Sequence, residues 1–214
     1  WRFLYGGYAS YNGSHQAYDG IGIYNNGGLL GATGAFYNGK FFSLWSASVG
    51  ANSAKAHTNF GADNFTMLSA GIAQKSGFNL PVFKNKLIIQ PNVMLSYTFV
   101  NTFDYTNASG VYINAKPLNV IHIEPQIKFV GNFKNLFQPY AAVSVAWNIL
   151  DDTRFRANDV YLPELSVKPY VRYGIGVQKR SGETFTGFLQ AYFTNGGRNG
   201  IGLQCGLRWA LGKK

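Results

Sequence analysis

Six charged side chains in the C-terminal half of the sequence have types and spacing that could support chemistry. Each alternates with apolar neighbours, so all six are predicted to share one face of their strands. A carboxylate among cations can act as a general acid or a nucleophile, or it can be a structural ion-pair partner. Lys128 lies two positions along the same face as Glu124, and two arginines lie on other strands, so we favour pairing. The six residues are His122, Glu124, Lys128, Lys168, Arg172 and Arg208.

Other residues that could carry chemistry are not spaced for it. The three histidines, His15, His57 and His122, have no metal-ligand spacing, and no serine lies in a nucleophile-elbow motif. Cys205 is the single cysteine and falls on the apolar face of the last predicted strand, which excludes a disulfide framework. The sequence therefore predicts no enzyme activity, no metal site and no cofactor.

The segments that position the six charged residues alternate strictly between apolar and polar side chains. From residue 165 the odd positions are apolar through Val177, whereas the even positions include Arg172 and Gln178. One face suits hydrocarbon and the other suits water, over a length close to the roughly 9–11 residues that a tilted transmembrane strand needs. Residues 87–99, 121–129 and 137–149 show the same pattern. We therefore expect membrane-spanning strands whose polar face, including the six charged residues, lines an aqueous lumen.

Composition supports this class of protein. The chain has 214 residues with 26 Gly, 16% aromatic and only 13% charged residues, about half the charged share of a soluble domain. Its net charge of +10 is scattered singly along the sequence, which argues against nucleic-acid binding. Attraction to anionic lipid headgroups, or the chemistry of the lumen, explains the sign better.

The sequence shows no internal division and no helical membrane segment. No stretch of about 18 apolar residues predicts a transmembrane helix, and no Pro/Ser-rich linker separates two domains, so residues 1–214 are predicted to form one domain. The sequence begins at Trp1 and carries no basic-then-apolar leader. We expect a processed or excised piece of a longer chain.

Turn signals divide the sequence into about twelve predicted strands, which favours a single antiparallel up-and-down transmembrane β-barrel, an all-β fold. Pro91, Pro125, Pro139 and Pro169 are expected near strand starts, where a missing hydrogen bond is tolerated. Short turns are expected at the periplasmic end and long loops outside, yet residues 52–64 and 100–109 are long and fall at the periplasmic end. Either the strands there extend farther or one is miscounted. The predicted strands are 2–11, 15–24, 29–37, 41–51, 65–75, 87–99, 110–116, 120–130, 137–149, 165–178, 184–194 and 200–211.

Several segments resemble the C-terminal half of an autotransporter β-domain. The resemblance covers roughly residues 85–211 and is carried by residues 123–132, 138–141, 168–171 and 195–200. It implies a twelve-stranded barrel, integral to the bacterial outer membrane, that helps to export a passenger joined to its N-terminus by a linker. Some members of that family cleave the passenger inside the pore, which offers Glu124 a catalytic role as the alternative to pairing.

The last predicted strand resembles the signal that the outer-membrane barrel-assembly machinery reads. That signal has a polar residue, then glycine, then aromatic and hydrophobic residues at alternate positions, and Gln204, Gly206, Trp209 and Leu211 occupy these places. The sequence departs from the pattern because it continues through residues 212–214 instead of stopping at an aromatic residue. The resemblance implies assembly by strand addition.

The sequence thus predicts an autotransporter translocator barrel of type V secretion, with its own passenger or linker segment, membrane lipid and the assembly machinery as partners. Two alternatives remain. The first is a passive outer-membrane pore, and the second is a barrel enzyme that hydrolyses lipid.

Overall fold

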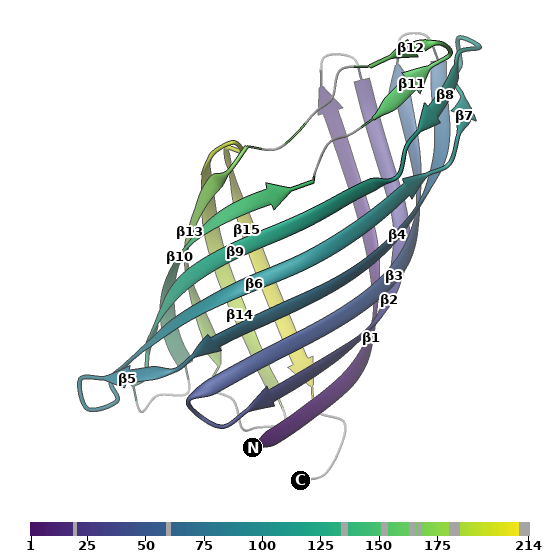
Figure 1. Cartoon of the computed structure of the whole chain (residues 1–214). Coiled ribbons are helices and arrows are strands. Elements are labelled where there is room, and N and C mark those ends of the chain that lie inside the picture. Colours follow the sequence, from purple (N-terminus) through teal and green to yellow (C-terminus); the bar gives the residue numbers. More distant parts are fainter. Residues whose placement is uncertain are drawn as a thin grey trace.

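The computed structural model describes residues 1–18, 21–58, 61–133, 137–150, 154–162, 166, 168–179 and 185–209. These residues form one large curled sheet and a smaller sheet at its upper end (Figure 1). The described residues include no helix that is long and apolar enough to cross a membrane. All the described secondary-structure elements are strands, so the fold is all-β, as predicted.

The large sheet runs β1-β2-β3-β4-β6-β9-β10-β13-β14-β15, and all neighbours are antiparallel. A short strand, β5, pairs only with β6 beside this path. The bounds are β1 (Arg2–Tyr18), β2 (Ile21–Tyr37), β3 (Phe41–Thr58), β4 (Gly61–Phe78), β5 (Leu80–Val82), β6 (Leu87–Thr102), β9 (Leu118–Gly131), β10 (Phe137–Ile149), β13 (Tyr170–Lys179), β14 (Phe185–Gly196) and β15 (Gly200–Trp209).

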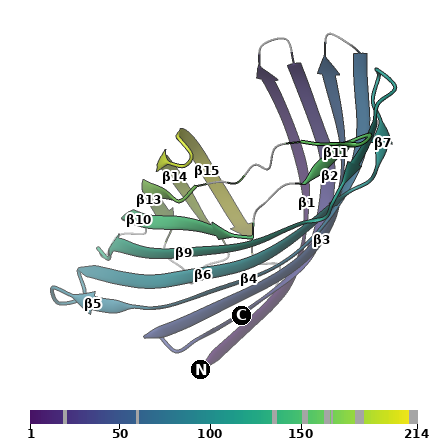
Figure 2. The same cartoon turned by 45° about the horizontal axis from the view of Figure 1, so that its top comes forward.

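This sheet curls into a half-barrel. In Figure 2, β14 and β15 stand opposite β1 and β2 across its concave side. Among the described residues β1 pairs only with β2, and β15 only with β14, so these two are edge strands where complete closure was expected. The curl follows from the right-handed twist of antiparallel strands, whereas closure would need a further hydrogen-bonded seam between the two edges.

The wall has fewer strands than predicted because the first three predicted strands are two. Residues 12–14 and 25–28 carry Asn and Gly and were interpreted as turns, yet Asn12 pairs with Gly27 and Gly13 with Asn26 inside a continuous ladder. The Tyr11 hydroxyl also donates to Asn26 Oδ1 over 2.7 Å. Cross-strand pairing here overrides the local turn preference.

The predicted strand 110–116 exists, but it lies outside the wall. It forms β8 (Tyr112–Ala115) of a four-stranded sheet that also contains β7 (Tyr105–Thr106), β11 (Phe155–Ala157) and β12 (Val160–Tyr161). We call this the rim sheet. Two hairpins build it, one from the β6–β9 connection and one from the β10–β13 connection, and they join where β8 pairs with β11.

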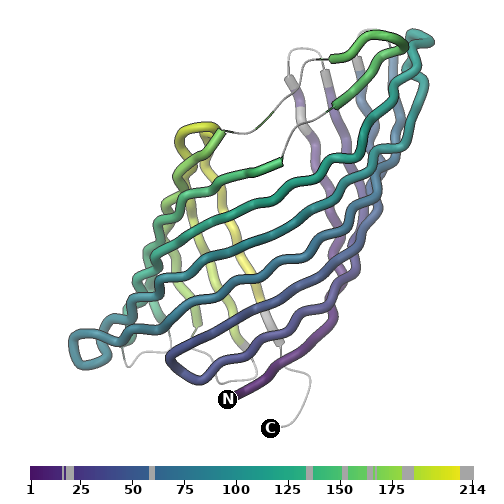
Figure 3. Tube along the Cα trace, viewed as in Figure 1, coloured from purple at the N-terminus to yellow at the C-terminus, as the bar shows by residue number. Residues whose placement is uncertain are grey.

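Removing this strand from the wall resolves the conflict over loop lengths. Residues 52–64 belong mostly to β3 and β4, which extend farther than predicted. The connections 103–117 and 150–169 now both leave the wall at the end that carries the rim sheet. Figure 3 shows the start of β1 and the end of β15 at the opposite end.

Contacts between strands two apart identify the concave face. Lys128 on β9 donates to Gln178 on β13, across β10, and Lys75 on β4 donates to Gln126 on β9, across β6. Strands two apart are separated by roughly 9–10 Å, so such contacts form only on the inside of the curve. The polar face of the alternating strands is therefore the concave one.

The convex face is apolar and exposed. Leu30, Val49 and Ile175 are 64%, 62% and 66% exposed. Leu30 and Val49 are cross-strand partners, and Ile175 lies opposite in phase to Arg172 and Gln178 on its strand. Exposed apolar side chains over a whole face are typical of a surface that another apolar phase covers. The predicted face assignment of 121–129 and 137–149 agrees with this burial pattern.

Proline positions differ from expectation at one site. Pro91 and Pro139 lie near strand starts and Pro169 precedes β13, but Pro125 lies in the middle of β9. The described β9–β10 ladder pairs Gln126 with Ser144 and Ile123 with Trp147 and has a gap at Pro125, which has no N–H to donate.

Aromatic rings on the concave face lie directly over glycines of the neighbouring strand. A Cβ on Gly176 would come within 2.6 Å of the ring of Tyr140, its cross-strand partner. The close approach therefore requires glycine, and the ring covers the bare backbone. The same arrangement occurs at Tyr8–Gly31, Phe42–Gly77, Phe188–Gly206 and Tyr192–Gly202.

Candidate functional site

The centre of the concave face is a buried carboxylate held by three strands. Glu124 of β9 is 4% exposed. Arg172 Nη1 of β13 lies 3.2 Å from both of its carboxylate oxygens, and Ser144 Oγ of β10 donates to Oε1 over 2.6 Å. His122 Nε2 lies 3.3 Å from Oε2, and its Nδ1 lies 2.7 Å from Asn148 Oδ1. We call these residues the Glu124 cluster.

This geometry holds charges in place and does not activate a nucleophile. In a catalytic triad the serine donates to the histidine, whereas Ser144 donates to Glu124 itself. The guanidinium of Arg172 stabilises the ionised carboxylate through charge-assisted hydrogen bonds. The contacts agree with the favoured interpretation, in which Glu124 pairs with an arginine across strands.

Lys128 lies on the same face but does not contact Glu124. Its Nζ donates to Gln178 Oε1 over 2.8 Å and stands 3.8 Å from the centre of the Tyr140 ring. Pairing with Glu124 along the strand, one of the partners considered, therefore does not occur. An amide oxygen and an aromatic face hold the ammonium group instead.

The remaining predicted charges are not brought into the Glu124 cluster. Lys168 is exposed in the segment before β13, beyond the end of the wall strand. The backbone at Arg208 pairs with Thr186 in the β14–β15 ladder, but its side chain lies outside the described part of the chain. Their lumen-facing roles stay predictions.

Several residues of this site were not singled out by the sequence. Ser144 and Asn148 stood on the polar face of 137–149, but a hydroxyl or amide alone gives no sign of its partner. Lys75 lies on β4, where glycine and alanine weaken the alternation, and its Nζ donates to Gln126 over 3.0 Å. The continuous pairing of β3 with β4 assigns Lys75 to the concave face. The sequence did not predict this continuous pairing, because residues 52–64 were interpreted as a long loop.

The predicted assembly signal lies on an edge strand. Gln204 pairs with Gln190 and Gly206 with Phe188, and the Phe188 ring occupies the space that a side chain at position 206 would need. Trp209 pairs with Phe185 through the backbone, while its side chain and Leu211 lie outside the described residues. The recognition of these four residues by an assembly machine stays a prediction.

The rim sheet is organised by hydrogen bonds to two aspartates. Asp63 Oδ1 accepts from the backbone N–H of Ala108 over 2.7 Å. The Tyr112 hydroxyl donates to Asp104 Oδ2 over 2.6 Å, and Asn114 Nδ2 donates to both Asp104 oxygens. The hydrogen bond from Tyr112, and after it those from Asn114, lower the pKa of Asp104, and the bond to Asp104 raises the pKa of Tyr112.

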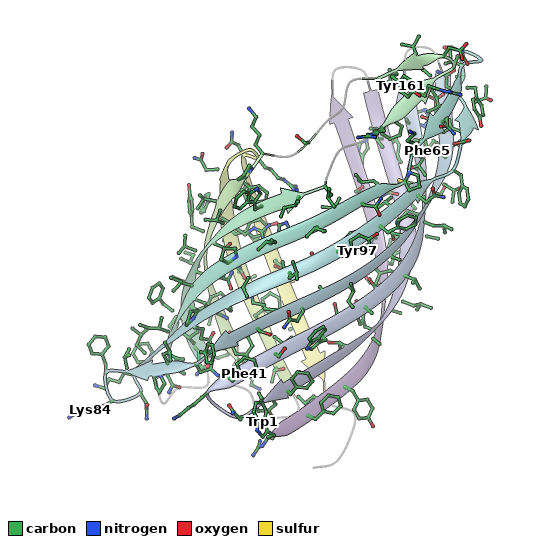
Figure 4. The ribbon with its side chains drawn as sticks, viewed as in Figure 1. Trp1, Phe41, Phe65, Lys84, Tyr97 and Tyr161 are labelled. Carbon is green, nitrogen blue, oxygen red and sulfur yellow. The ribbon has the colours of Figure 1, made fainter. Side chains whose placement is uncertain are left out.

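Aromatic side chains attach this sheet to the wall. The rings of Phe65 and Tyr105 stack with centres 5.0 Å apart, and Figure 4 shows Phe65 and Tyr161 near the same upper end. At the opposite end Figure 4 shows Trp1 beside Phe41, with ring centres 6.2 Å apart.

Among the described residues no group of three or more His, Cys, Asp or Glu is placed to hold a metal ion.

Comparisons with known proteins connect this geometry to one class of solved structures. No family model and no curated protein sequence matches the chain. The transport unit of the autotransporter AIDA-I from Escherichia coli superposes with a TM-score of 0.79 at 14% identity, over 89% of this chain and 68% of that one. The β-domain of the Bordetella autotransporter BrkA gives 0.77 at 16% identity, over 98% and 84%.

A third solved structure extends the same pattern. The translocator domain of the autotransporter NalP from Neisseria meningitidis gives a TM-score of 0.56 at 14% identity, over 88% of this chain and 66% of that one. The three structures are a transport unit, a β-domain and a translocator domain of autotransporters. The fold of this chain is that of the autotransporter translocator β-domain.

Proposed function

We propose that the chain is the translocator of an autotransporter, a single domain over residues 1–214 integral to the bacterial outer membrane. It anchors a passenger encoded before it and helps to export or display that passenger at the cell surface. One observation carries the proposal. The convex face of the curled wall exposes apolar side chains, whereas its concave face is polar.

The mechanism follows from the solvent properties of the bilayer. When a polypeptide crosses hydrocarbon, each backbone amide without a hydrogen-bond partner costs several kcal/mol of free energy. The concave face presents amide and charged groups such as Gln178 and Lys128, which can exchange hydrogen bonds with a passing chain. The driving energy comes from outside the barrel, for example from passenger folding.

The proposed partners follow from the same surfaces. Membrane lipid and lipopolysaccharide cover the convex face, the passenger or its linker occupies the concave side, and the barrel-assembly machinery adds β15 through its free edge. The proposal is non-catalytic, because Glu124 is already engaged by Arg172 and Ser144. Replacing Glu124→Gln should leave passenger release unchanged.

The experiment uses the complete gene product, including the passenger, in cells with an outer membrane. Protease added to intact cells should remove the passenger, while heat-modifiable migration of the β-domain on gels reports that the barrel is folded. A folded barrel whose passenger stays protected in the periplasm would contradict export. If no passenger is encoded upstream, ion conductance by the purified barrel would support the passive pore instead.

A further inference from the structure

A cavity on the concave face, lined by both polar and apolar side chains, lies outside the Glu124 cluster. It has a volume of about 570 Å³ and lies toward the end of the wall where β15 ends. Four glutamines line it, one from each of β10, β13, β14 and β15, together with a lysine of β9, a tyrosine of β10 and the lysine that ends β13, and with apolar side chains that include Phe188 and Leu207. The polar residues used below are Lys128, Gln138, Tyr140, Gln178, Gln190 and Gln204.

Hydrogen bonds hold the cavity wall in a defined arrangement. Gln178 accepts from Lys128 and donates through Nε2 to Gln138 Oε1 over 3.2 Å. The Tyr140 hydroxyl donates to Gln190 Oε1 over 3.0 Å. The amide oxygens of Gln178, Gln138 and Gln190 therefore face donors of the wall, and N–H groups of Gln190 are left to donate to a ligand.

The cations of this face outnumber its carboxylates. Of the four carboxylates among the described residues, Asp63, Asp104 and Asp159 lie toward the rim sheet, and only Glu124 lies within the wall. The described concave contacts place three basic side chains on the same face as that one carboxylate. They are Lys75, Lys128 and Arg172.

Neutral groups hold the two lysines. Arg172 forms an ion pair with Glu124. Lys75 donates to the amide oxygen of Gln126. Lys128 donates to the amide oxygen of Gln178 and lies over the ring of Tyr140. Lys128 also experiences repulsion from Lys75, whereas Lys75 is attracted by Glu124 and, more weakly, repelled by Arg172. The concave face therefore carries a net positive charge, because its basic side chains outnumber the carboxylates among the described residues.

We propose that this cavity binds carboxylate groups, with Lys128 supplying the charge and the glutamine side chains supplying N–H donors. Ammonium and amide donors together recognise an anion through charge-assisted hydrogen bonds. Acidic side chains of an extended polypeptide and small free anions both present this chemistry. The inference goes beyond export, because the same cavity would bind anions in a passive pore.

The test uses the complete protein in detergent micelles and three probes, namely hexaglutamate, hexaglutamine and inorganic phosphate, with affinity measured by calorimetry. Hexaglutamate should bind more tightly than hexaglutamine, and Lys128→Gln should weaken it by about tenfold or more, the value of one charge-assisted hydrogen bond. Lys128→Arg keeps the charge and should restore binding. Lys75→Gln should weaken it less, because Lys75 acts through its field.

Lys84→Gln is the matched control, since Lys84 projects from the turn after β5 and away from the concave face (Figure 4). It removes the same charge and should leave the affinity unchanged. Binding of hexaglutamate without phosphate identifies polypeptide carboxylates as the ligand, and binding of both identifies anions in general. Equal affinity for hexaglutamate and hexaglutamine, or an unchanged affinity in folded Lys128→Gln protein, would overturn the inference.

Discussion

The N-terminal wall (β1–β4) and the C-terminal wall (β9, β10, β13, β14 and β15) share one sheet but are stabilised differently. Strands β1–β4 have 17, 17, 18 and 18 residues, whereas β13 and β15 have 10 each. The concave face of β3 carries small residues such as Ser46, Ser48 and Gly50, while that of β9–β13 carries the Glu124 cluster. Long backbone ladders stabilise the first wall, and side-chain networks specify the second.

Strand length also separates the two walls by environment. A tilted strand needs roughly 9–11 residues to span the bilayer, so β1–β4 are longer than one span. The convex face of β3 changes from Val49 to Ser53, Lys55 and His57 toward the rim sheet. We therefore infer that the upper parts of β1–β4 stand outside the lipid, together with the rim sheet.

The largest expected effect tests that boundary. Ile175→Arg and Val49→Arg place a charge on the convex face within the apolar band and should each destabilise the folded barrel by about 2–4 kcal/mol. Ser53→Arg, higher on β3, should cost about 0–1 kcal/mol. Urea unfolding in lipid vesicles measures the free energy of unfolding of all three variants. Equal losses for Val49→Arg and Ser53→Arg would contradict a membrane edge between these two positions of β3.

The next effect tests the charge network of the C-terminal wall. Arg172→Ala leaves Glu124 buried without its cation and should destabilise the barrel by up to about 3 kcal/mol, less than a fully buried pair because Arg172 is partly exposed. Ser48→Ala on the N-terminal wall should change stability by less than about 0.5 kcal/mol. Replacing both Glu124→Gln and Arg172→Met should recover most of the loss, and a double variant no better than Arg172→Ala would contradict the pairing.

A smaller effect compares aromatic–glycine packing in both walls. Gly176→Val would collide with the Tyr140 ring and should cost about 1–3 kcal/mol, and Gly31→Val against Tyr8 should cost a similar amount. Adding Tyr140→Ala to Gly176→Val should relieve part of the cost, because the colliding ring is gone. Unfolding midpoints of the single and double variants provide the measurement, and simple additivity would argue against ring-over-glycine contact.

The smallest effect is the pH response of the rim sheet. The hydrogen bonds from Tyr112 and Asn114 lower the pKa of Asp104 in the folded state. Their stabilisation is therefore present above the ordinary aspartate pKa and is lost as pH falls through the lowered value. Hydrogen exchange of β7 and β8 amides should accelerate in that acid range, and Asp104→Asn should abolish the pH dependence while the wall strands stay unchanged.

The sequence alone determined which face of each C-terminal strand is polar, because side chains alternate with a period of two wherever a strand is extended. Residues 121–129 and 137–149 needed no tertiary information for that assignment. Glycine and alanine removed the contrast in the first sixty residues, so Asn12–Gly27 pairing inside one ladder was not predictable from local turn preference.

Only the tertiary structure decided what the polar residues contact. Curvature of the sheet brings Arg172 to Glu124 across β10 and Lys75 to Gln126 across β6, and neither approach is encoded by spacing within a strand. The rim sheet likewise arises when two loops distant in sequence pair at β8 and β11. Local periodicity therefore fixes orientation, whereas register and curvature, which depend on many strands together, fix the partners.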